Sequence, residues 1–283
     1  MKKLVPKEWW DSWYEKKRTC SRPDAPRKTF TTTKLGQYFC HYSDYLLWDV
    51  TLKKFLPKTK GVKVLEVGSA PGDFLVRLHK RYGFIPYGVE YSEPGVIQNR
   101  KLFSLYNIDP DNVIHADFFD YKFQDRFRQH FDIVISRGFI EHFTDVEDVI
   151  DKHLNLLADG GYLMVSIPNL SRRSIYGACS SLIDSERLEM HNLDIMSKQK
   201  FSKLFERRGL SALYCDYCGT LRLSLLASSD KFLFRLALSA CHKLQMLLNP
   251  IFRLILRDRG FESTRFSPFL LYIGLKTDEG DRV

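Results

Sequence analysis

Between residues 61 and 168, short apolar runs alternate with segments of helical pattern. A strand that is buried on both faces reads as a continuous apolar run, and a helix reads as apolar residues three or four apart. The predicted strands are VKVLEVG, IPYGVEY, NVIHADFF, FDIVISRG and YLMVSIP, and the main predicted helices cover residues 72–83, 93–107 and 146–161. Strict alternation of this kind predicts an α/β fold with a doubly wound, mostly parallel sheet. Ligands of such sheets bind beyond the carboxyl ends of the strands.

The sequence divides into four parts around this alternation. Residues 1–34 form a basic, aromatic arm, residues 35–221 the core, residues 222–262 an amphipathic helical insertion, and residues 263–283 a final core strand and tail. The arm contains Trp9, Trp10 and Trp13, which we expect to pack on the domain; the alternative is that they cover a pocket. After Pro168 we expect a long amphipathic helix over residues 197–210 and strands at residues 210–219 and 266–276.

The positive charge of the chain lies at its two ends. The net charge of +9 comes from +6 in residues 1–34 and +5 in residues 222–265, so the remainder carries −2. Basic flanks of this kind favour an anionic partner, such as a membrane surface, a phosphorylated substrate or nucleic acid. The sequence has neither a secretory h-region nor a long uncharged apolar stretch, which predicts a cytoplasmic protein.

The turn after the first predicted strand carries the strongest chemical signal. It reads Glu66-Val67-Gly68-Ser69-Ala70-Pro71-Gly72, and glycines in a strand-to-helix turn let the backbone approach a ligand closely. Carboxylates stand at or just past the ends of the first three strands: Glu66, Asp73, Glu90 and Asp117. Such a setting disfavours an anionic pyrophosphate and suits a ligand with an ammonium, a sulfonium and a ribose diol.

These residues, in this order, resemble the class I S-adenosylmethionine-dependent methyltransferases, with Ala70 in place of the middle glycine of the first motif. The resemblance implies a seven-stranded sheet whose last strand is antiparallel, and S-adenosylmethionine as the cofactor. It implies that Glu66, Gly68 and Gly72 line the methionine part and that Glu90 binds the ribose. It also places Asp117 and Phe118 beside adenine, and Ser136, Arg137 and Gly138 near the methionine end. Ser69 and Tyr91 neighbour these positions and complete the predicted cofactor site.

Two histidines are candidates for a general base. Glu141-His142 resembles the pair found in small-molecule methyltransferases such as the quinone O-methyltransferases, and the segment around His191 resembles enzymes of polysaccharide biosynthesis. An imidazole near the methyl group could take the proton of a hydroxyl acceptor. The alternative for both histidines is a local structural role. Arg172, Arg173 and Asn192 are candidate substrate-binding residues, and we expect no metal site, because the cysteines of Cys215-Asp-Tyr-Cys218 have no partner pair at useful spacing.

The insertion contains one helical stripe of polar residues between Lys231 and Arg257. Its members are Lys231, Arg235, Ser239, His242, Gln245, Asn249, Arg253 and Arg257, and the opposite face is apolar. We expect a cap helix that buries the apolar face on the core or on a second subunit. The alternative is an interfacial helix on an anionic bilayer. Pro250 should break or kink the helix.

These observations predict an O-methyltransferase that acts on a small-molecule, saccharide or lipid-linked hydroxyl. A nucleic-acid methyltransferase is the second hypothesis, although the segment after the fourth strand, Ser136-Arg137-Gly138-Phe139, lacks the motif typical of base-methylating enzymes. A non-catalytic module that binds the cofactor is the third.

Overall fold

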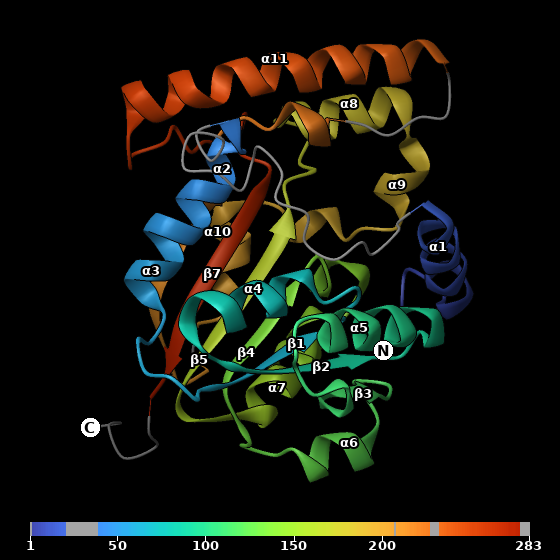
Figure 1. Cartoon of the computed structure of the whole chain (residues 1–283), viewed down its shortest axis with the longest axis vertical. Helices are drawn as coiled ribbons and strands as arrows, with labels where there is room; N and C mark the ends of the chain where they lie inside the picture. The colour runs from blue at the N-terminus through green and yellow to red at the C-terminus, as the bar shows by residue number, and fades with distance from the viewer. Residues whose placement is uncertain (1, 21–38, 207, 227–231, 278–283) are drawn as a thin grey trace.

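A computed structural model of the chain describes residues 2–20, 39–206, 208–226 and 232–277 (Figure 1). The TFTTTK run of the arm, Lys231 and the tail beyond residue 277 lie outside the described residues, as does the side chain of Arg235.

The core is one seven-stranded sheet with the strand order β3-β2-β1-β4-β5-β7-β6. The strands are β1 (Lys63–Val67), β2 (Ile85–Glu90), β3 (Val113–His115), β4 (Phe131–Arg137), β5 (Leu157–Pro168), β6 (Leu210–Cys218) and β7 (Phe269–Lys276). Strands β1 to β5 pair in parallel, whereas β7 pairs antiparallel with both β5 and β6. The predicted fold class is therefore confirmed.

Helices cover both faces of this sheet (Figure 1). They are α1 (Lys7–Cys20), α2 (Tyr42–Tyr45), α3 (Leu52–Phe55), α4 (Asp73–Tyr82), α5 (Glu93–Leu105), α6 (Tyr121–Arg126), α7 (Val146–Leu156), α8 (Ile175–Ile183), α9 (Ser185–Glu189), α10 (Lys198–Lys203) and α11 (Phe232–Leu256). Shorter helical turns are η3 (Leu46–Thr51), η4 (Pro110–Asn112), η5 (Ile140–His142), η6 (Leu193–Ile195) and η7 (Leu223–Leu225).

Alternate residues of the central strands enter two separate hydrophobic clusters. Leu65 and Val134 belong to one cluster, while their neighbours Val64 and Ile133 belong to the other. Successive side chains of a strand point to opposite faces, so the two clusters are the cores on the two sides of the sheet. This two-sided burial explains why β1 and β4 read as continuous apolar runs.

Two predicted helices are shorter than expected. Helix α7 ends at Leu156, and the next residues already belong to β5, where Leu157 pairs with Phe131 and its carbonyl accepts a hydrogen bond from the Lys276 ammonium. Strand pairing therefore overrides the expected glycine stop. Helix α10 ends at Lys203, although the expected helix extended to residue 210.

Helix α11 turns the opposite face to the one expected. Gln245 and Asn249, from the polar stripe, are buried against the domain, whereas Leu247 and Leu254, from the apolar face, are exposed. The expectation that a cap helix buries its apolar face on the core of this chain is therefore wrong. The helix also continues through Pro250 without a break. No described helix is long and apolar enough to cross a membrane.

Candidate active site

A cavity of about 200 Å³ opens at the carboxyl ends of β1, β2 and β4. Many of the predicted cofactor residues line it: Gly68, Ala70, Glu90, Tyr91, Asp117, Phe118, Arg137 and Gly138; so does the candidate base His142. The glycine turn therefore has the expected place, because parallel strands deliver their following loops to one edge of the sheet.

Four predicted cofactor residues, namely Glu66, Ser69, Gly72 and Ser136, are not among the residues that line the cavity. The Ser69 hydroxyl accepts a hydrogen bond of 2.7 Å from the Asn99 amide. Gly72 has a φ of 99°, and an added Cβ would come within 2.1 Å of the Asn99 side-chain oxygen. Ser69 and Gly72 therefore help to fix the turn after β1, which carries the lining residues Gly68 and Ala70.

Glu66 is a buried carboxylate with one unused oxygen. Its Oε1 accepts a hydrogen bond of 2.8 Å from Nε of Arg137, and its Oε2 has no partner. Burial raises the pKa of Glu66, and the nearby Arg137 opposes this shift. An unpaired buried acceptor is costly, so this site favours a ligand that brings a cationic donor.

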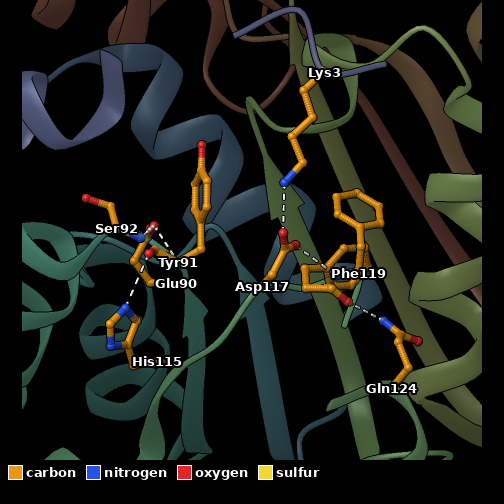
Figure 2. Close-up of polar contacts among 9 residues, drawn as sticks. Lys3, Glu90, Tyr91, Ser92, His115, Asp117, Phe119 and Gln124 are labelled. Atoms are coloured by element: carbon orange, nitrogen blue, oxygen red, sulfur yellow. Dashed lines mark hydrogen bonds and ion pairs between the residues drawn. The ribbon is translucent and has the colours of Figure 1, made fainter. Parts of the chain in front are cut away.

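Glu90 faces the cavity from the end of β2 and is held by backbone donors (Figure 2). Its Oε1 accepts hydrogen bonds of 2.9 Å from the amides of both Tyr91 and Ser92, and its Oε2 receives only a long contact of 3.4 Å from the Ala70 amide. Burial raises the pKa of Glu90, while these backbone donors lower it. The second oxygen can therefore accept hydroxyl groups of a ligand.

The start of the chain closes the cavity beside Asp117. The Lys3 ammonium lies 2.8 Å from Asp117 Oδ2, and it points down onto that carboxylate in Figure 2. The amide of Leu4 donates to the His142 carbonyl at 2.8 Å, and Lys3 forms a β-bridge with Phe143. Residues 2–4 therefore lie alongside the turn after β4 and pair with it through their backbone.

Helix α1 supplies a wall of the cavity through Trp10, Trp13 and Tyr14. The Tyr14 hydroxyl donates to the Ala70 carbonyl at 3.2 Å, and the ring of Trp10 meets that of His142 with centroids 5.4 Å apart. The sequence analysis favoured packing of the tryptophans on the domain and gave covering a pocket as the alternative; Trp10 and Trp13 do line the cavity, whereas Tyr14 was not among the candidate residues. Their i, i+3, i+4 spacing was a helix signal that could have revealed a common face.

Three side chains with metal-binding chemistry converge at the turn after β4. The ligand atoms of Glu141, His142 and His191 lie within 4.8 Å of one another, and no other group among the described residues was found that could hold a metal ion. The two imidazoles hold their Nδ1 atoms 2.7 and 2.6 Å from the carbonyls of Met190 and Arg187. Because a carbonyl only accepts, each Nδ1 carries the proton and each Nε2 keeps a lone pair.

Burial controls the protonation of this cluster. It lowers the pKa of His142, lowers that of His191 to about 4, and raises that of Glu141 to about 8. Without a cation, the neutral forms of all three side chains are therefore favoured near pH 7. His142 lines the cavity and His191 does not.

The predicted substrate residues lie away from the cavity wall. Arg172 and Arg173 are exposed in the turn after β5. The Asn192 amide is engaged on both sides, since it donates to the Phe143 carbonyl at 3.2 Å and accepts from the Asp194 amide at 3.2 Å. Its backbone amide also donates to the Glu141 carbonyl at 2.6 Å, so Asn192 fixes the loop beside the histidine pair.

The cysteines of the CxxC segment are free thiols in strand β6. Burial raises the pKa of Cys215 to about 11 and that of Cys218 to about 12. Thiols with such pKa values stay protonated, and a structural role is consistent with this.

Comparisons with known proteins agree with this geometry. A family profile described as a methyltransferase domain matches residues 39–214. No curated protein sequence matches the chain. Among solved structures, the chain resembles a Haloferax volcanii methyltransferase complex with the activator Trm112, with 17% identity, coverage of 95% and 98% of the two chains, and a TM-score of 0.54.

Two further structures share the fold at low sequence identity. Geranyl diphosphate C-methyltransferase from Streptomyces coelicolor is 16% identical, with coverage of 83% and 77% and a TM-score of 0.54. Phosphoethanolamine N-methyltransferase 2 from Haemonchus contortus is 14% identical, with coverage of 88% and 58% and a TM-score of 0.53. The family match spans well over half of the sequence, and the chain belongs to the methyltransferase-domain family, as a class I S-adenosylmethionine-dependent methyltransferase.

Proposed function

We propose that this enzyme methylates a hydroxyl group on a saccharide, lipid-linked or other small acceptor. The observation that carries the proposal is the state of His142: it lines the cavity, and its Nδ1 is occupied by the Met190 carbonyl. The free lone pair on Nε2 can accept the proton that a hydroxyl loses when its oxygen becomes methylated. The requirement for a neighbouring base is different when the methylated atom is a nitrogen or a carbon.

The residues proposed to hold the cofactor are those whose side-chain oxygens have unused hydrogen-bonding capacity. When bound, S-adenosylmethionine supplies a methyl group on a positively charged sulfur. Oε2 of Glu66, which lacks a partner, suits the ammonium of the methionine part, and Oε2 of Glu90 suits the ribose hydroxyls. Asp117 and Phe118 line the neighbouring part of the cavity, where the adenine ring would lie.

His191 has a supporting role in this proposal. Its ring lies 4.7 Å from that of His142, centroid to centroid, but it is outside the cavity lining. Asn192 ties the same loop to the turn that carries Glu141 and His142. The loop therefore positions the base, and the acceptor itself would enter from the side of the cavity that His142 faces.

The first experiment measures transfer of a labelled methyl group from S-adenosylmethionine to saccharide, lipid and RNA fractions. We expect label in the saccharide or lipid fraction as an alkali-stable ether. His142→Ala should lower turnover about a hundredfold or more and leave cofactor affinity unchanged. The matched control is His130→Ala, because His130 immediately precedes β4 at the end of that strand away from the cavity.

Three results would contradict the proposal. Label in RNA would support the hypothesis of a nucleic-acid methyltransferase. Full activity of His142→Ala, measured where methyl transfer is rate-limiting, would show that His142 is not the base. Activity that is lost on chelation and restored by a divalent cation would reassign Glu141, His142 and His191 from proton transfer to metal binding.

Cofactor placement has its own test. Glu90→Ala should weaken S-adenosylmethionine binding by about 1–3 kcal/mol in calorimetry, because it removes a buried hydrogen-bond acceptor. Glu93→Ala is the control, since Glu93 is exposed three residues further along the chain. Equal affinities of the two variants would show that Glu90 does not bind the ribose.

A further inference from the structure

Helix α11 carries an unusual concentration of exposed apolar side chains. Seven of the fifteen large hydrophobic residues exposed in the described part of the chain belong to this one helix: Leu236, Leu244, Met246, Leu247, Ile251, Leu254 and Ile255. Four of them expose 60% or more of their surface, namely Leu236, Leu247, Leu254 and Ile255. We call these seven residues the outward face of α11. Exposed apolar side chains gathered on one helix in this way mark an interaction site.

Polar contacts fix the helix in this orientation. The Gln245 side chain accepts a hydrogen bond of 2.8 Å from the Leu223 amide and donates one of 2.8 Å to Asn249. Asn249 in turn donates to the Phe39 carbonyl at 3.0 Å and accepts from the Tyr42 amide at 3.3 Å. Rolling the helix over would break this buried network, so the outward face cannot turn inward without a large cost.

Contacts at the end of the helix add to the same anchoring. The Arg253 guanidinium lies 3.8 Å from the centre of the Tyr45 ring, and the Tyr42 hydroxyl donates to the Arg257 carbonyl at 2.7 Å. Because Gln245, Asn249 and Arg253 of the polar stripe attach the helix to the domain, the apolar residues are left for another surface.

The charges around the outward face indicate what that surface is. The sequence from Lys231 to Arg257 contains no acidic residue, and residues 222–265 carry a net charge of +5. Lys243, Arg257 and Arg259 are exposed on or next to the helix. Apolar residues flanked by cations fit the boundary between acyl chains and anionic headgroups.

The dimensions of the helix fit a position on a bilayer better than one across it. Its 25 residues correspond to about 37 Å along the axis, but the buried Gln245 and Asn249 interrupt its apolar character. No described helix qualifies as a membrane span. The helix therefore fits a bilayer lengthwise, with its polar side attached to the protein.

We propose that the outward face of α11 binds the surface of an anionic phospholipid bilayer and presents the enzyme to acceptors held there. Figure 1 shows α11 at the end of the molecule toward which β5 points, with α8 at the same end. The cavity also lies at the carboxyl ends of the parallel strands. Leu182, which belongs to α8, is 86% exposed. The inference does not depend on the acceptor being a hydroxyl.

The test is co-sedimentation of the full chain with vesicles of phosphatidylcholine and phosphatidylglycerol, compared with phosphatidylcholine alone. We expect binding to the anionic vesicles, weakened by salt. The double variant Leu247→Gln/Leu254→Gln should bind at least tenfold more weakly, because two inserted side chains are lost. Neutralising Lys243 and Arg257 as Lys243→Gln/Arg257→Gln should weaken binding about fivefold per cation.

A matched control separates this surface from exposed apolar residues in general. Ile97→Gln/Leu105→Gln alters two exposed residues of α5 and should leave vesicle binding unchanged. Thermal unfolding of all variants should match that of the wild type, because each altered side chain is exposed.

The proposal is overturned if the wild type does not bind anionic vesicles at low salt, or if it binds neutral vesicles equally well. It is also overturned if Leu247→Gln/Leu254→Gln instead converts a dimer to a monomer in sedimentation velocity with no effect on vesicles. Failure here and failure of the proposed chemistry are distinguishable: vesicle binding needs no methyl transfer, and cofactor affinity should be the same in every α11 variant.

Discussion

Helices α7 and α11 are both amphipathic, but they turn opposite faces toward the domain. In α7, the buried residues are Val146, Val149, Ile150, His153 and Leu156. Among the side chains of α11 that the structure describes, Gln245 and Asn249 are fully buried, whereas Leu236, Leu247 and Leu254 are exposed. The difference shows that an amphipathic pattern defines two faces but does not say which one meets the core. That choice depends on whether the domain offers apolar surface or unpaired polar groups at the docking position.

The largest expected difference in stability is between a charge placed on the apolar face of α7 and one placed on the apolar face of α11. Ile150→Asp should destabilise the fold by about 4 kcal/mol or more, because Ile150 is fully buried and a carboxylate there has no partner. Leu254→Asp should change stability by less than about 0.5 kcal/mol, because Leu254 is 70% exposed. Urea unfolding of both variants checks the contrast, and a Leu254→Asp variant that unfolds would place the outward face inside an interface.

A smaller effect should follow from the buried polar residue of α7. Burial lowers the pKa of His153 to about 4 from its ordinary 6.5. Between these values the unfolded chain binds the proton and the folded chain does not, so stability rises with pH across this window. The contribution is about 3 kcal/mol at 1.36 kcal/mol per pKa unit. Unfolding of wild type and His153→Phe at pH 4 to 7 should therefore give a steeper rise for the wild type; equal slopes would show that His153 titrates normally.

The smallest of the three effects concerns the polar anchor of α11. Asn249→Ala removes the hydrogen bonds of the Asn249 side chain with the Phe39 carbonyl and the Tyr42 amide, which should cost about 1–3 kcal/mol. Ser239→Ala, at an exposed position of the same polar stripe, is the control and should be neutral. If Asn249→Ala is also neutral in thermal unfolding, the helix is not held by its polar side.

The predictable part of the fold is the part governed by periodicity. Strands β1, β2 and β4 are buried on both faces, so their apolar runs identified them, and their order of appearance predicted the parallel sheet. The boundary between α7 and β5 was not predictable in the same way, because Leu157 joins the strand through pairing with Phe131, a partner that local sequence does not reveal.

The candidate site was predictable where it depends on the turns after the strands, and less so elsewhere. Gly68, Glu90 and Asp117 follow consecutive strands, so topology brings them together. The wall formed by Trp10 and Trp13 comes from a segment with no core pattern, and its place depends on tertiary contacts such as that between Tyr14 and Ala70. The convergence of His191 with His142 likewise depends on a loop whose path no short motif specifies.

The position of the tryptophans has a spectroscopic consequence. Of the four tryptophans in the chain, Trp9, Trp10 and Trp13 lie on α1, while Trp48 is buried in the core beside Arg77. Trp10 and Trp13 line the cavity, so the intrinsic emission of the protein is weighted toward the cavity wall, with the shielded indole of Trp48 as an internal reference. Acrylamide should quench the α1 indoles in preference to Trp48, and a ligand that fills the cavity should reduce that quenching. The protein therefore carries a built-in optical reporter of occupancy that needs no added dye.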